Sequence, residues 1–205
     1  MKRFLSLLMS ICLLLSMGAI LSACDEDSKK EEEGSSEGDL KTLSQAEWEV
    51  MLQDANFYNV TFAIDAIVLE GLGVSSGTPY KDEIKVDGDK ALIEGEVETN
   101  PETIQSVVNV YFSLATAIVK DYSKFEYDAQ ANLYVAKEAI VFPVTVAGIN
   151  ANITATDVKL SVSADNKIAS VSCIMRQDID QGEQGMTIIL DSVLSFSNYG
   201  TTVVE

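Results

Sequence analysis

The chain has 205 residues, 32 of them acidic and 14 basic, which gives a formal net charge of −18. Because it has no basic cluster, such a chain repels a phosphate backbone, and this argues against nucleic acid as a partner. It contains no histidine. A histidine general base, a histidine-activated nucleophile and histidine metal ligands are therefore excluded.

The first 23 residues have the three parts of an export signal. Lys2 and Arg3 precede an apolar run from Phe4 to Leu21, and small residues close it. The run is about the minimum length for a membrane helix and is diluted by serines and a glycine, which favours a cleaved signal over a membrane span.

The residues Leu21-Ser22-Ala23-Cys24 resemble the lipobox of bacterial lipoproteins. The resemblance implies cleavage between Ala23 and Cys24, lipidation of Cys24, and anchoring on the extracytoplasmic face of the cell membrane. Since each buried CH₂ contributes roughly 0.8 kcal/mol, two or three acyl chains can hold an acidic protein on an anionic membrane. An ordinary secretory signal that contains a cysteine by chance is the alternative.

Residues 24–42 are predicted to be a lipidated acidic tether, and residues 43–205 a single domain. No apolar residue lies between Cys24 and Leu40, so the tether has nothing to pack. A flexible chain of about 18 residues spans on the order of 20 to 25 Å, and its charge extends it further. We therefore expect the domain to stand off the membrane.

The chain offers no pair of cysteines for an internal disulfide. Cys12 belongs to the signal and Cys24 to the lipid anchor, which leaves Cys173 alone. Cys173 shares a strand face with Val171 and Met175, and this favours a buried, unreactive thiol over a reactive or intermolecular one.

A first helix is predicted between Thr42 and Asn56. Ser44 and Glu47 have the spacing of a capping box, and an apolar stripe follows. Trp48, the only tryptophan, is interpreted as the packing anchor of this helix rather than as a platform for a ligand.

A second helix is predicted from Pro101 to Lys120, with Asn100 as the cap and Pro101 in the first turn. No formally charged residue occurs between Thr103 and Val119. The segment carries four or five polar side chains opposite a broad apolar face, which favours a helix covered by a sheet over a second membrane span.

Alternation with a period of two predicts strands over most of the remainder. A long strand is expected from Val60 to Val68, a loop from Gly71 to Pro79, and a hairpin at 81–97 with its turn at Asp87-Gly88. A change of parity after Asp157 predicts a bulge. Short turns between successive strands predict an antiparallel meander, whose further strands are expected at 132–136, 139–146, 149–162, 168–175 and 186–197.

The strand order and three short motifs resemble the LolA and LppX group of bacterial envelope proteins, over most of residues 43–205. The resemblance implies an α+β fold, in which a curved antiparallel sheet forms a half-barrel with a long helix on its concave face, around an apolar cavity for acyl chains. It supplies no fixed ligand-binding residue to carry over. The motifs are Lys85-Val86-Asp87-Gly88-Asp89-Lys90, residues 159–168, and Phe196-Ser197-Asn198-Tyr199-Gly200.

Two sequence patterns resemble functional motifs, but we interpret both as structural features. Residues 73–77 match G-x-S-x-G but have neither an α/β pattern nor a histidine partner, so a flexible loop is favoured. Asp178 to Glu183 place oxygen ligands at alternating positions without the rest of an EF-hand pattern, so an acidic turn is favoured over a calcium site. We predict no catalytic residue, metal site or cofactor.

The leading hypothesis is a non-enzymatic lipoprotein that binds a lipid or another apolar ligand between its sheet and its second helix. The alternative is a cavity-free adhesive or scaffold domain that binds another protein, and an enzyme with a carboxylate or metal mechanism comes third. Five residues on the uncharged helix face are the candidate ligand contacts: Ile104, Val108, Tyr111, Ala115 and Ile118.

Overall fold

The structure, a computed structural model, describes residues 42–53, 59–71, 75–93, 95–146, 149–179 and 186–204. The predicted signal, Ala23, Cys24 and all but the end of the tether lie outside these residues, as do Gly73 and Val74 of the G-x-S-x-G segment. In the described part the chain is α+β: two helices, one short 3₁₀ helix and an open antiparallel sheet of ten strands. None of the helices in this described part is long and apolar enough to cross a membrane.

The helices and strands follow one another in this order along the chain: α2 (Gln45–Gln53), β1 (Asn59–Glu70), β2 (Thr78–Asp87), β3 (Lys90–Ile93), β4 (Glu96–Glu98), α3 (Pro101–Val119), the 3₁₀ helix η2 (Tyr122–Lys124), β5 (Phe125–Asp128), β6 (Leu133–Ala136), β7 (Ile140–Val146), β8 (Ile149–Val162), β9 (Ile168–Ile179) and β10 (Met186–Ser197).

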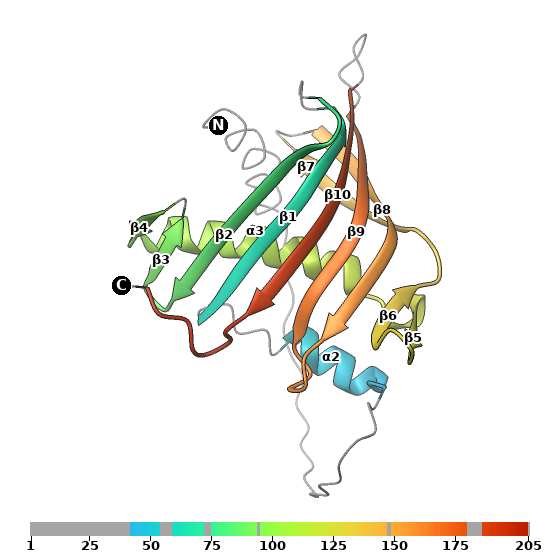
Figure 1. Cartoon of the computed structure of the whole chain (residues 1–205), viewed down its shortest axis with the longest axis horizontal. Coiled ribbons are helices and arrows are strands. Elements are labelled where there is room, and N and C mark those ends of the chain that lie inside the picture. The colour runs from blue at the N-terminus through green and yellow to red at the C-terminus, as the bar shows by residue number, and fades with distance from the viewer. Residues whose placement is uncertain are drawn as a thin grey trace, which may run out of the picture.

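The sheet has the strand order β4-β3-β2-β1-β10-β9-β8-β6-β5, and β7 pairs with β8 off this path. The expectation of a simple meander was therefore wrong in one respect, because β1 pairs along its length with the last strand, β10, from Thr61↔Ser197 to Glu70↔Ile189. Two antiparallel sets of strands, β1–β4 and β5–β10, are joined through α3 and pair at the middle of the sheet. The second set also departs from a meander, because β6 and β7 both pair with β8. Figure 1 shows the twisted strands with α3 crossing behind them.

The apolar face of α3 packs in one core with the inner face of the sheet. Val107, Leu114 and Val119 of the helix are buried together with Phe62 and Leu194 of the central strands. The helix has 19 residues, so the expected long helix is an ordinary one of about 28 Å at 1.5 Å per residue. It begins as predicted, with Pro101 in its first turn and the side chain of Asn100 accepting a hydrogen bond from the Glu102 amide (2.9 Å).

The predicted turn and bulge are confirmed by backbone geometry. Asp87 pairs with Lys90 across Gly88, which has φ +62°, as a tight hairpin turn requires. In β8 the register shifts between Thr156 and Lys159, and Asp157 has φ +53°. This bulge returns Val158 to the buried side of the strand.

Three strand predictions need correction. The expected loop at 71–79 ends earlier, because β2 begins at Thr78. The short strands β4 and β5 were not predicted. Asp178, expected in an acidic turn, lies in β9, where it accepts hydrogen bonds from Arg176 (2.9 Å) and Thr187 (2.7 Å); residues 180–185 lie outside the described residues.

The prediction that Cys173 is buried is confirmed. The residue is 3% exposed on the inner face of β9, in the same core as Val171. Burial, with a smaller contribution from the Asp191 carboxylate, raises the pKa of its thiol to about 12. The thiol is therefore protonated at neutral pH, as an unreactive cysteine would be.

Candidate ligand-binding cleft

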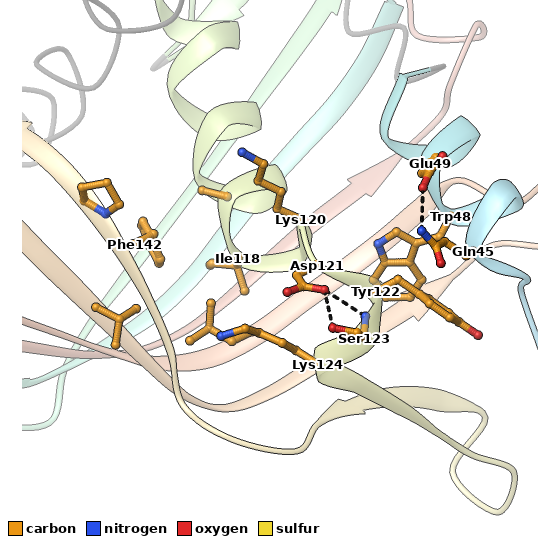
Figure 2. Close-up of a pocket in the computed structure, with 14 residues that line it drawn as sticks. Gln45, Trp48, Glu49, Ile118, Lys120, Asp121, Tyr122, Ser123, Lys124 and Phe142 are labelled. Atoms are coloured by element: carbon orange, nitrogen blue, oxygen red, sulfur yellow. Dashed lines mark hydrogen bonds between the residues drawn. The ribbon is translucent and has the colours of Figure 1, made fainter.

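A cleft of about 490 Å³ lies at the C-terminal end of α3, between α2, η2 and β7 (Figure 2). Its floor is apolar and its rim is polar and charged. Fourteen residues from these four elements and the turn between α3 and η2 line it: Gln45, Trp48, Glu49, Ala117, Ile118, Lys120, Asp121, Tyr122, Ser123, Lys124, Ile140, Val141, Phe142 and Pro143.

The α2 wall is fixed by Trp48. This residue is fully buried, and its ring lies 5.1 to 5.3 Å from the rings of Tyr122, Phe125 and Tyr134. Its indole N–H donates to the backbone carbonyl of Val119 (2.9 Å), one of the last carbonyls of α3, which have no partner within their own helix. Trp48 therefore acts as the predicted packing anchor and also forms part of the cleft.

The start of α2 is set by its own sequence. The Ser44 amide donates to the Glu47 carboxylate (2.7 Å), and the Glu47 amide donates to the Ser44 hydroxyl (3.3 Å), which confirms the predicted capping box. The helix ends at Gln53, and the remaining residues of the predicted helix, 54–56, lie outside the described residues.

The chain is held where it enters the domain. The backbone amide of Leu43 donates to the Tyr134 hydroxyl, and the Leu43 carbonyl accepts from the Tyr122 hydroxyl (2.9 Å). Burial is the main cause that raises the pKa of Tyr134, so this hydroxyl stays neutral. Two tyrosines thus fix Leu43 beside the cleft, one of which, Tyr122, also lines it.

The opposite wall is formed by the turn from α3 into η2. Asp121 caps η2, where its carboxylate accepts from the Ser123 amide (3.0 Å) and hydroxyl (2.6 Å). The hydrogen bond from the Ser123 hydroxyl is the main cause that lowers the pKa of Asp121, so this carboxylate is negatively charged at neutral pH. Lys124 pairs with Glu138 (3.2 Å) at the surface.

Apolar side chains close the cleft on the β7 side. Ile140 and Phe142 are buried on one face of β7, whereas Val141, on the other face, is 56% exposed. Pro143 has no amide hydrogen to donate, and prolines in sheets are confined to edges and bulges, as suits a strand that pairs with β8 alone.

The structure places the five predicted ligand contacts in different surroundings. Ile118 lines the cleft, whereas Ile104, Val108 and Ala115 are buried in the core between α3 and the sheet. The side chain of Tyr111 lies outside the described residues. Their role in binding stays a prediction, and only Ile118 has been placed at a cavity.

The polar residues of the cleft were not identified from the sequence. The segment 120–124 has a local signal, an aspartate followed two residues later by serine, which is typical of a cap. That signal predicts a helix start and not a cleft, because the cleft also needs α2 (Gln45–Gln53), which comes from a distant part of the chain. Among the described residues, no group of three or more potential metal ligands occurs.

No family model matches the chain, and no curated protein matches its sequence.

Proposed function

We propose that the chain is a non-enzymatic extracytoplasmic lipoprotein, held in the cell membrane through lipidated Cys24, and that its domain binds an apolar or amphipathic ligand in the cleft. The cleft itself is the main observation behind this proposal. Its volume of about 490 Å³ lies within the range of roughly 300 to 1,000 Å³ of small-molecule sites. The apolar floor and polar rim suit a ligand with an apolar body and a polar end.

The proposal includes the finer architecture that the LolA and LppX resemblance implies. The sheet then acts as a half-barrel, and α3 lies on its concave face. The buried residues shared by α3 and the central strands support this arrangement. The ligand, however, is assigned to the cleft at the end of α3, since Ile104, Val108 and Ala115 pack in the core.

The position of the cleft along the chain also supports the proposal. Leu43, which follows directly after the proposed tether, is fixed by Tyr122 and Tyr134, and α2 forms one wall of the cleft. A ligand leaving the membrane would therefore meet the cleft on the first element after the tether.

The binding part is tested with the chain from residue 24 onward, carrying Cys24→Ser so that no lipid is attached. A fluorescent fatty acid should bind saturably to this protein. Ala117→Phe, which places a ring in the cleft, should weaken binding at least tenfold. Val97→Phe, at an exposed site away from the cleft, should leave it unchanged. A folded protein that binds no fatty acid would contradict the proposal.

The anchor is tested separately in cells. The intact mass of the wild-type protein should show loss of residues 1–23 and addition of acyl groups, and the protein should fractionate with membranes. Cys24→Ser should remove both the added mass and the membrane retention. An unchanged mass and fractionation would exclude lipidation at this position.

A second function, binding another protein, is favoured by the outer face of the sheet. Ile67 of β1 and Val193 of β10 are 41% and 37% exposed there, beside the partly buried Ile174 of β9. If this function holds instead, the double variant Ile67→Ser and Val193→Ser should abolish capture of a partner from envelope extracts, while Ala117→Phe should have no effect.

A further inference from the structure

The charges around the cleft are distributed unevenly between its walls. The α2 wall carries Glu49, whose carboxylate accepts a hydrogen bond from Gln45 (3.0 Å). The opposite wall carries Lys120 and Lys124 with Asp121 between them. In Figure 2 the two lysine side chains leave the backbone on either side of Ile118 and point away from α2.

Lys120 differs from the other charged residues that line the cleft. Glu49 is bonded to Gln45, Asp121 to Ser123, and Lys124 to Glu138. Within the described part of the chain, the exposed ammonium of Lys120 makes no ion pair or hydrogen bond. A positive charge is therefore available at the rim of an apolar cleft.

Lysines also gather at this point in a chain that has few of them. Lys137 donates from its ammonium to the Ser123 carbonyl (2.9 Å), and its amide donates to the Lys124 carbonyl (2.9 Å). Three lysines thus surround η2 in a protein with 14 basic and 32 acidic residues. Since Lys124 is paired with Glu138, the positive charge open to an anion at the cleft is that of Lys120.

We propose that the ligand of the cleft is an amphiphile with an anionic head, which ion-pairs with Lys120 while its hydrocarbon chain lies against the more exposed apolar residues of the cleft, Ala117, Val141 and Pro143. This inference rests on the proposed function and specifies its ligand class. The Asp121 carboxylate accepts its hydrogen bonds from Ser123 in η2, and its negative charge offsets part of the attraction of Lys120 for the head group. Lys124 is paired with Glu138, so the charge open to the head group on that wall is that of Lys120.

The test compares three amphiphiles of equal chain length: a fatty acid, the corresponding alcohol and the corresponding trimethylammonium compound. Binding to the Cys24→Ser chain from residue 24 is measured by calorimetry at low and high salt, below the micelle concentration of each compound. The fatty acid should bind most tightly and should lose its advantage at high salt, where charge interactions are screened.

Lys120→Gln should weaken fatty acid binding about fivefold, on the scale of one solvent-exposed ion pair, and should leave binding of the alcohol unchanged. Lys90→Gln is the matched control, because it removes the same charge at the start of β3, outside the cleft. Since Lys120 also caps α3, thermal unfolding of both variants checks the fold. A structural role alone would not alter the order of preference among the three compounds.

The remaining outcomes separate the two proposals. If all three amphiphiles bind with equal affinity, or if Lys120→Gln weakens the alcohol as much as the acid, the assignment of an anionic head is overturned and the binding function stands. If none of them binds to the folded protein, both proposals fail.

Discussion

Trp48 connects α2, α3 and β5–β6 through one side chain. Its ring contacts three aromatic rings, and its N–H bonds to the end of α3. The sequence identified it as a packing anchor, because a single tryptophan on an amphipathic helix has that role most often. It gave no indication of the cleft, which depends on the positions of η2 and β7.

Trp48→Ala should lower the free energy of unfolding by about 3 to 5 kcal/mol, since it removes a buried aromatic side chain and leaves a cavity. Val50→Ala, at a 52% exposed position of the same helix, should change it by less than about 0.5 kcal/mol. Urea unfolding followed by circular dichroism measures both. Similar values for the two variants would contradict the anchoring role.

Cys173 should react slowly with a thiol reagent in the native state and rapidly in urea, because burial raises its pKa to about 12.

The raised pKa of Cys173 also predicts a pH dependence of stability. Above the ordinary pKa of 9.0 the unfolded thiol ionises while the folded one does not, so stability is fully present below pH 9 and falls toward pH 12. Cys173→Ala should remove that part of the dependence, and an unchanged pH profile would argue against it.

Local sequence signals decided where the elements begin and turn. The capping box of α2, the Asn100 cap, the Asp87-Gly88 turn and the bulge at Asp157 were all predicted, because each depends on residues within a few positions of one another. The strand β4 was missed because its three residues are too few to show a period of two, and β5 was also missed. The pairing of β1 with β10 joins the two ends of the domain, and no local pattern reports it.

Asn100→Ala should reduce stability by about 1 kcal/mol, because it removes the hydrogen bond to the Glu102 amide at the start of α3. Asn100→Asp should restore most of the loss, since aspartate accepts the same bond and favours the positive end of the helix. Thermal unfolding of the three proteins gives the comparison. An aspartate variant as unstable as the alanine variant would exclude capping as the cause.

At the scale of the whole molecule, the proposed account joins a strongly acidic domain to a membrane through acyl chains rather than through charge. In this proposal the acidic excess would keep the domain from the anionic membrane surface, and the tether would let it stand off. The cleft then lies beside Leu43, where the tether would enter the domain, and Lys120 and Lys124 are among the residues that line it. Neither this placement nor the cleft could be predicted from composition, because composition counts residues and does not say where they lie in the fold.

The occupancy of the cleft can be measured directly through Trp48, because it is the only tryptophan in the chain and lines the cleft. A fatty acid with bromine atoms in its chain quenches indole fluorescence only at short range. Titrated into the Cys24→Ser chain from residue 24, it should quench Trp48 saturably, whereas the Ala117→Phe variant should keep its fluorescence. If the brominated acid binds without quenching Trp48, or if a folded protein shows no saturable response, the ligand does not occupy this cleft.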